Sequence, residues 1–270
     1  MKTAQEKLKS NYEENKHICV GLDPDKLKIP SSLLTSDDPV FQFNKEIIDA
    51  TKDLALGYKL NFAFFESEGI KGIETLYKTI EYIGDNHFII GDAKRGDIGN
   101  TAEKYAHSLF NEFKVDASTL HPYMGFDSIE PFLNYHEKLN FILVLTSNPG
   151  AADFEKVRIS NDKFLYQEVL TKVLSWNKHK NLGIVFGATQ ISELEGNVSS
   201  FEGLPVLLPG VGAQGGSLED VVRLFIKYKN NNFIINSSRG IIYKSNGNDF
   251  AEQARIELSK LNQAVAENKI

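Results

Sequence analysis

Eight short apolar runs, each followed by a helix-length segment, constrain the fold of this chain more than any other feature. The runs begin near His17, Tyr58, His87, Val115, Asn140, Leu182, Pro205 and Asn232. Several are apolar without a break, for example residues 141–145 and 206–208. Unbroken apolar runs are typical of parallel strands that are covered on both faces, whereas half-exposed strands alternate. The sequence therefore predicts parallel strands joined by helices.

Helical spacing of apolar residues supports the same architecture. The predicted helices are 40–56, 72–83, 101–113, 128–136, 163–176, 191–194, 218–229 and 250–266. A length of 270 residues fits one barrel or two ordinary domains. Eight alternating strand and helix units favour an α/β fold of the (β/α)8 TIM-barrel type, with residues 1–270 as a single domain. A doubly wound open sheet is the alternative.

Nearly every predicted strand ends in polar residues. They are Asp23, Lys59 with Asn61, Asp92 with Lys94, His121, Ser147 with Asn148, Thr189, Gln214, and Ser237 with Arg239. In a barrel, the carboxyl ends of the strands form one mouth, which carries the active site in barrel enzymes. We therefore expect these side chains to surround one site.

The stretch 91–101 places four charged residues within six positions at a strand end, namely Asp92, Lys94, Arg95 and Asp97. Side chains two apart in a strand share a face, so Asp92 and Lys94 point together, as do Lys59 and Asn61 on the preceding strand. Charges rarely enter a core unless they are paired or functional. We expect a buried cluster in which each lysine keeps Asp92 ionised, although a solvated loop with a chance ion pair is the simpler interpretation. Asp97 lies beyond the strand end, where it would either fold back onto the same mouth or reach a neighbouring subunit.

The glycines at 210, 212 and 215 match the G-x-G-x-x-G pattern of dinucleotide-binding folds. That interpretation requires an acidic residue about twenty positions further on, and residues 230–238 contain none. The position after the seventh strand instead suits the phosphate site of barrels, where Arg239 would add a bidentate contact. A tight turn beside a surface arginine is the alternative.

Composition excludes several classes of function. Apolar residues make up 41% of the chain and charged residues 24%, and the formal net charge is −6. We therefore expect a protein that binds neither nucleic acid nor membrane, and the single cysteine, which cannot form an internal disulfide, favours the reducing cytoplasm. Cys19, the single cysteine, lies in an apolar run and is expected to be a buried thiol. No clustered set of metal ligands is evident, and His121 is either a general base or a structural hydrogen-bonding group.

Residues 92–101 resemble the D-x-K-x-x-D signature of the orotidine 5′-phosphate decarboxylase family, in the form found in its second bacterial type. Further segments resemble the family in the same order: 21–24, 59–66, 122–125, 146–150 and 209–214. The likeness runs from about residue 18 to residue 240 and includes nearly every strand end.

The resemblance implies a homodimeric barrel with shared active sites. It would convert orotidine 5′-phosphate to UMP and carbon dioxide, the last step of de novo UMP synthesis, without metal or organic cofactor. Lys94 would protonate C6 of the base, and Asp92 would face the substrate carboxylate. The other implied site residues are Lys59, Asn61 and Asp23 around the ribose and the charged network, Asp97, Ile98 and Thr101 in the partner's site, Ser147 at the pyrimidine edge, Gln214 between base and phosphate, and Arg239 on the phosphate.

Two other functions are consistent with a barrel of this type. A sugar-phosphate decarboxylase or aldolase of the same superfamily would need Mg²⁺ and further carboxylates as its ligands, and Lys59 would repel that ion. A non-catalytic phosphate-binding barrel would keep Gln214 and Arg239 but has no use for the charged cluster.

Overall fold

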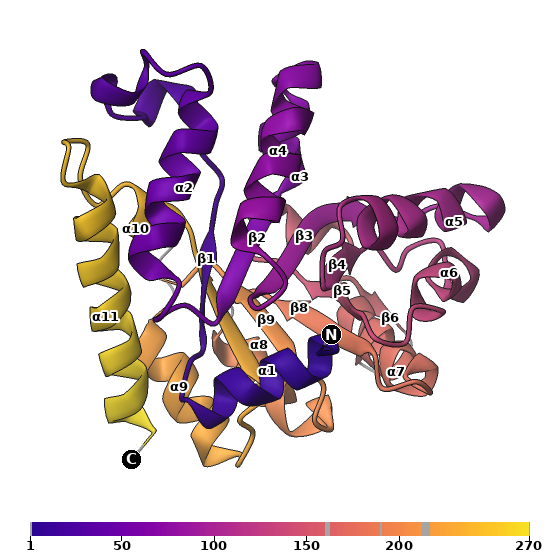
Figure 1. Ribbon diagram of the computed structural model, residues 1–270. Coiled ribbons are helices and arrows are strands. Elements are labelled where there is room, and N and C mark those ends of the chain that lie inside the picture. The colour runs from indigo at the N-terminus through magenta and orange to yellow at the C-terminus, as the bar shows by residue number, and fades with distance from the viewer. Residues whose placement is uncertain (1, 160–162, 190, 212–216, 270) are drawn as a thin grey trace.

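The chain forms a closed barrel of eight parallel strands surrounded by helices (Figure 1). The computed structural model describes residues 2–159, 163–189, 191–211 and 217–269. The barrel strands are β1 (Ile18–Gly21), β2 (Gly57–Asn61), β3 (Phe88–Arg95), β4 (Ala117–Leu120), β5 (Leu139–Leu145), β8 (Leu182–Phe186), β9 (Val206–Pro209) and β10 (Phe233–Ser237). Because β1 pairs with both β2 and β10, the sheet is closed, and the open-sheet alternative is wrong. Each strand begins within two residues of its predicted start.

Most helices lie outside the barrel, between successive strands. They are α2 (Pro39–Thr51), α4 (Gly69–Ile83), α5 (Gly99–His107), α6 (Glu130–Leu133), α7 (Leu165–Trp176), α8 (Ile191–Asn197) and α9 (Leu218–Lys227), with α11 (Phe250–Asn268) after the last strand. The last helix, α11, lies beside α2 on the outside of the barrel (Figure 1). The predicted helix 128–136 is shorter, because a 3₁₀ turn at Phe126–Ser128 precedes α6.

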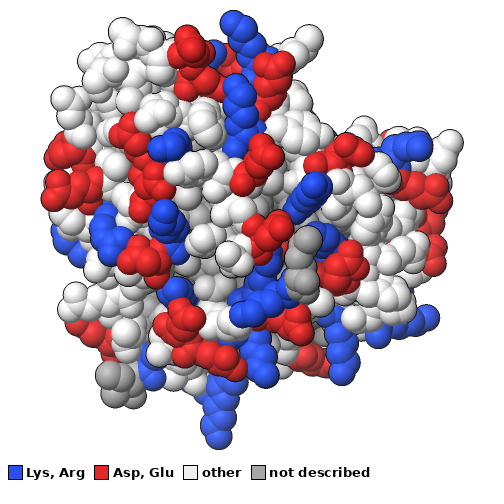
Figure 2. Space-filling view, in the orientation of Figure 1, with Lys and Arg blue, Asp and Glu red and all other residues white. Residues whose placement is uncertain are grey.

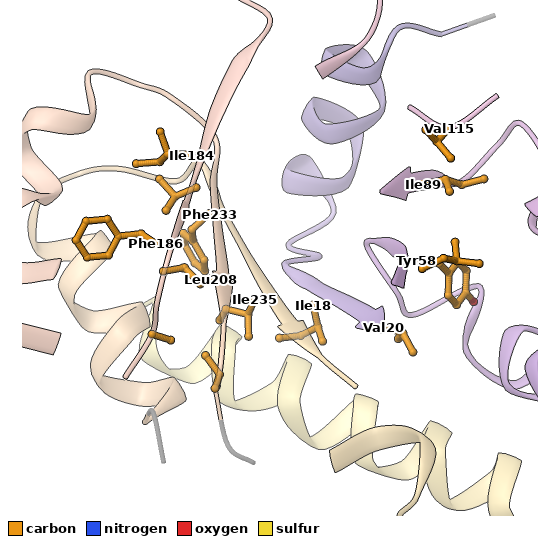
Figure 3. Packing of buried hydrophobic residues seen from close by; sticks show 14 of the residues in the cluster. Ile18, Val20, Tyr58, Ile89, Val115, Ile184, Phe186, Leu208, Phe233 and Ile235 are labelled. Atoms are coloured by element: carbon orange, nitrogen blue, oxygen red, sulfur yellow. The ribbon is translucent and has the colours of Figure 1, made fainter. Parts of the chain in front are cut away.

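Two hydrophobic clusters form the core. Successive residues of one strand belong to different clusters, as Ile18 and Cys19 of β1 do, because successive side chains point to opposite faces. Figure 3 shows the outer cluster, with Ile18 and Ile235 on the paired strands β1 and β10 next to α11. The inner cluster fills the barrel, and within it Cys19 is a buried free thiol, as expected.

A helix that the sequence interpretation missed, α1 (Ala4–Glu13), crosses one end of the barrel (Figure 1). Its Ala4 and Leu8 join the inner cluster. The Lys7 ammonium lies 2.8 Å from the Asp116 carboxylate at the start of β4, and both side chains are buried. A capping box between Thr3 and Glu6 begins the helix. This helix therefore closes the end of the barrel opposite the carboxyl ends of the strands.

Several shorter elements follow the carboxyl ends of the barrel strands. They are α3 (Phe62–Glu66) after β2, α10 (Arg239–Ile242) after β10, and the two-stranded pair β6 (Arg158–Ile159) and β7 (Lys163–Phe164) after β5. Acidic and basic side chains are interspersed over the face seen in Figure 2. Within the described ranges, no helix is long and apolar enough to cross a membrane.

Candidate active site

The paired strands β2 and β3 bring a lysine against an aspartate at the barrel mouth. Their register sets Asn61 beside Asp92, and the Lys59 Nζ lies 2.6 Å from Asp92 Oδ2. Both charged residues are buried, with 7% of Lys59 and 5% of Asp92 exposed. The predicted meeting of the two strand ends is therefore confirmed.

Lys94 completes the cluster but is not buried with it. Its Nζ lies 2.7 Å from Asp92 Oδ1, while 45% of the Lys94 side chain remains exposed. The backbone of Lys94 is left-handed, with φ of 46°, and the β3–β4 register shifts between Gly91 and Arg95. The expectation that Lys94 would be buried on the strand face is wrong, because this bulge takes its backbone out of the extended conformation.

The ionisation of the cluster follows from these contacts. Burial disfavours the charged form of Asp92, but Lys59 and Lys94 outweigh burial and hold the pKa of its carboxyl well below its usual range. Burial likewise disfavours the charged form of Lys59, but Asp92 and Asp23 raise its pKa above the usual value. Lys59 and Asp92 are therefore both charged at neutral pH.

Thr119 on β4 is part of this cluster, although the sequence interpretation did not include it. Its Oγ1 donates to Asp92 Oδ1 at 2.8 Å and accepts the backbone N–H of Lys94 at 3.0 Å. The available signal was its place on the strand, because Thr119 is two residues from Ala117, which faces the barrel interior.

A cavity of about 370 Å³ opens beside the cluster, between the ends of β1, β2, β9 and β10. Four of the predicted site residues line it, namely Asp23, Lys59, Asn61 and Arg239. Asp23 Oδ1 accepts the backbone N–H of Asn61 at 3.0 Å, which fixes one wall. Asn236 also lines the cavity, and its buried side-chain carbonyl has no hydrogen-bond partner among the described residues. Lys28 and Asp25 also line the cavity and lie 3.8 Å apart. The lining is therefore mixed in charge, and Arg239 is the cationic side chain available to an anionic group of a polar ligand.

The remaining predicted residues lie outside this cavity or outside the described ranges. Asp97 and Ile98 follow β3, and the Asp97 Oδ1 accepts the Ile98 N–H at 2.8 Å. Ile98 is 51% exposed, and Thr101 in α5 is exposed as well. Ser147 follows β5, where its backbone carbonyl accepts the Thr189 hydroxyl at 3.4 Å. None of these residues lines the cavity.

Gln214 and the glycines at 212 and 215 lie outside the described residues. The phosphate site predicted after the seventh strand is therefore described only in part, by Gly210 and Val211 on one side and Arg239 on the other.

His121 follows β4, and its backbone N–H donates to the Arg95 carbonyl at 2.9 Å. Burial, and then the nearby Lys94, lower the pKa of its imidazole. His121 also lines a largely apolar cavity of about 590 Å³ together with Phe154 and Tyr166.

No three His, Cys, Asp or Glu side chains gather into a metal-binding group within the described part of the chain. A closed β/α barrel with a Lys–Asp–Lys cluster and a polar, charged cavity at the carboxyl ends of its strands has the architecture of a barrel enzyme that acts on a small polar ligand.

The family follows from the comparison of the chain with known proteins. Residues 16–254 match the orotidine 5′-phosphate decarboxylase / HUMPS family, and the chain belongs to that family. It is 47% identical over 268 residues to the orotidine 5′-phosphate decarboxylase of Flavobacterium johnsoniae, covering 98% of this chain and 97% of that protein.

Solved structures give the same result. The OMP decarboxylase of Leishmania donovani superposes with a TM-score of 0.79 at 29% identity, covering 97% of this chain and 99% of that chain. The UMP synthase of the same organism superposes with a TM-score of 0.83 at 32% identity. That match covers 97% of this chain and 57% of the synthase chain.

Proposed function

We propose that this chain decarboxylates orotidine 5′-phosphate to UMP and carbon dioxide, the last step of UMP synthesis. The observation that carries the proposal is the Asp92 carboxylate, which Lys59 holds on one oxygen and Lys94 on the other. Its family, and the relatives named for this activity, support the same reaction.

The reaction breaks the bond between C6 of the pyrimidine and its carboxylate. The carboxylate leaves as carbon dioxide, and the electron pair of the broken bond stays on C6, which then takes a proton. Because the ring offers no electron sink, the required barrier reduction lies near the upper end of the ~8–23 kcal/mol that enzymes commonly supply. A fixed cation beside C6 stabilises the charge as it develops.

We assign this role to the Lys94 ammonium. It is the partly exposed lysine of the cluster, whereas Lys59 is buried against Asp92. We assign the proton transfer to C6 to the Lys94 ammonium, and we assign Asp92 to the position facing the substrate carboxylate. Lys59 then keeps Asp92 charged after Lys94 has given up its proton.

The cavity suits the ribose and phosphate of the same substrate. We assign Asp23 and Asn61 to the ribose hydroxyls, because both line the cavity next to Lys59. Arg239 is assigned to the phosphate, which its guanidinium can bind in a bidentate manner. Gln214 is assigned between base and phosphate, on the strength of the family resemblance alone, and Ser147 likewise to the pyrimidine edge.

We further propose a homodimer in which Asp97, Ile98 and Thr101 complete the partner's site. Apolar side chains exposed beside the mouth support an interface there, since Ile98 is 51% exposed and Tyr123 is 84% exposed. The whole chain, residues 1–270, is proposed to act as one domain in the cytoplasm, where a single buried thiol is in keeping with reducing conditions.

The Mg²⁺-dependent alternative fits these contacts less well. A hard cation needs several oxygen ligands, and the Asp92 oxygens accept bonds from Lys59, Lys94 and Thr119. A non-catalytic phosphate-binding barrel would not need the three contacts that Lys59, Lys94 and Thr119 make with Asp92.

One assay tests the proposal and its alternative together. Purified protein treated with EDTA is mixed with orotidine 5′-phosphate, and the loss of orotate absorbance is followed alongside the formation of UMP. We expect the same turnover with and without the chelator. No turnover in either condition would contradict the proposed function, and turnover that EDTA removes and Mg²⁺ restores would favour the metal-dependent class.

A further inference from the structure

The conformation of Lys94 must be held in place by something outside its own side chain. A left-handed backbone is costly for a residue with a Cβ atom, and Lys94 adopts one with φ of 46°. Its side chain is also long and 45% exposed, so that many rotamers compete with the one that reaches Asp92.

The sheet does not supply the missing restraint. At the register shift, the β3–β4 pairing passes from Gly91 with Ser118 to Arg95 with Leu120. The Lys94 N–H lies within the shift and donates instead to the Thr119 hydroxyl oxygen at 3.0 Å. The Thr119 hydroxyl therefore accepts the N–H that a backbone carbonyl of the neighbouring strand would accept in a regular sheet.

The direction of each hydrogen bond is fixed by chemistry. A backbone N–H can only donate, and an ionised carboxylate can only accept. The Thr119 hydroxyl must therefore accept from the Lys94 N–H and give its single proton to Asp92 Oδ1, which lies 2.8 Å away. That same oxygen accepts the Lys94 ammonium at 2.7 Å. The contacts close a ring in which Thr119 and Asp92 hold the backbone and the ammonium of one lysine.

We propose that Thr119 is a positioning residue for the decarboxylation, which aligns the Lys94 ammonium by fixing both ends of that residue. The inference rests on the proposed function, because alignment matters only if Lys94 acts on the substrate. Thr119 is 2% exposed and does not line the cavity, so it acts through Lys94 and Asp92. A small displacement of a reacting group costs about a hundredfold in rate, which sets the size of the expected effect.

Three variants separate this role from a structural one. Thr119→Val removes the hydroxyl at nearly constant volume, and Thr119→Ser keeps it. Thr79→Val is the matched control, because the Thr79 hydroxyl is also fully buried, donates to the Thr75 carbonyl at 2.7 Å and accepts from Asn44 at 3.4 Å. Thr79 lies on α4, between the outer helices and outside the charged cluster.

Turnover of orotidine 5′-phosphate by the wild type is measured first, because its absence would reject the proposed function and the role of Thr119 with it, whereas an active wild type lets the variants test Thr119 alone. Given that turnover, we expect Thr119→Val to lower kcat by about a hundredfold while the Kd for UMP stays within about threefold. Thr119→Ser should stay within about threefold of wild-type kcat, and so should Thr79→Val.

Backbone hydrogen exchange adds a readout that does not depend on activity. The Lys94 amide should exchange faster in Thr119→Val than in Thr119→Ser, while the amides of β5 stay protected in both. If Thr119→Val does not fold, Thr119→Ala removes the hydroxyl without setting a methyl against Asp92, and the same expectations apply. The proposal is overturned if the hydroxyl-free variant keeps wild-type kcat, if the serine variant loses as much as the valine variant, or if the loss appears only in KM.

Discussion

At the scale of single residues, Arg239 tests the phosphate end of the site. It lines the cavity together with Lys28, which is paired with Asp25 at 3.8 Å. A bidentate contact to phosphate is worth about 3 kcal/mol, so Arg239→Ala should raise KM about a hundredfold with a smaller effect on kcat. Arg239→Lys keeps the positive charge but loses the bidentate guanidinium, so its KM should lie between those of the wild type and Arg239→Ala. Steady-state kinetics with orotidine 5′-phosphate measures both, and equal turnover of orotidine without its phosphate would contradict the assignment.

His17 makes the stability of the fold depend on pH. Its ring is fully buried and stacks on Phe233 at 4.0 Å, its Nδ1–H donates to the Phe233 carbonyl, and its Nε2 accepts from Lys269 at 3.1 Å. Burial lowers the pKa of His17 from 6.5 to about 4. The unfolded chain therefore takes up a proton at higher pH than the native state does, and stability present above pH 6.5 is lost as the pH falls towards 4.

The expected loss from this histidine is about 2 kcal/mol between pH 7 and pH 5. Urea unfolding at the two values measures it, and His17→Gln should remove most of that difference. His107→Gln is the control, because the His107 side chain is 55% exposed, and it should behave as the wild type does. Identical pH dependence in the wild type and His17→Gln would show that another group is responsible.

At the scale of elements, the strands were predictable and the path of one strand end was not. Unbroken apolar runs with polar ends located all eight barrel strands, because burial on both faces leaves that pattern. The contact between Lys59 and Asp92 was predictable, because side chains two apart in a strand share a face and the two strands are neighbours. The bulge at Lys94 was not predictable, because nothing in the local sequence indicates that a lysine will adopt a positive φ. The place of Thr119 two residues from Ala117 indicated that it faces the barrel interior, but its bond to the Lys94 N–H could not be predicted, because that bond exists only where the ladder shifts.

Helix α1 was missed although its signals are present. Thr3 and Glu6 form a capping box, and Ala4 and Leu8 lie four residues apart on the face that meets the barrel. The segment is rich in charged residues, which is typical of an exposed tail and hides these helix signals. One of its charged residues, Lys7, is nevertheless buried.

The buried ion pair of α1 predicts a large effect on stability. Lys7 donates to both oxygens of Asp116 at 2.8 Å and to the His87 carbonyl at 3.0 Å. Lys7→Met would leave the buried carboxylate without its partner, and we expect the free energy of unfolding to fall by about 3–5 kcal/mol. Lys9→Met on the same helix removes a lysine whose side chain is 79% exposed and should cost less than about 0.5 kcal/mol. Urea unfolding of both variants decides, and equal losses would contradict a structural role for Lys7.

At the scale of the whole molecule, the proposed dimer predicts complementation between two inactive variants. Lys94→Ala and Asp97→Ala homodimers should each have little activity. In a heterodimer, one site collects both substitutions, while the other combines an intact Lys94 with an intact Asp97 from the partner. Half of a random mixture is heterodimer and half of its sites are whole, so activity should recover to about one quarter of wild type per site.

Native mass spectrometry must show that heterodimers have formed in the mixture. A mixture of Lys94→Ala with itself is the control and should recover nothing. Heterodimers without recovered activity would place Asp97 in the site of its own subunit, which would contradict the shared-site dimer.

The most direct test of the charged cluster is the turnover of Lys94→Ala beside its affinity for UMP. Removing a general acid and the cation beside C6 should lower kcat by about a thousandfold or more. UMP lacks the carboxylate, so its Kd should stay within about tenfold of wild type. Lys260→Ala, an exposed lysine on α11, should match the wild type in both measurements. A folded Lys94→Ala enzyme with near-normal kcat would contradict the role of this cluster in the chemistry.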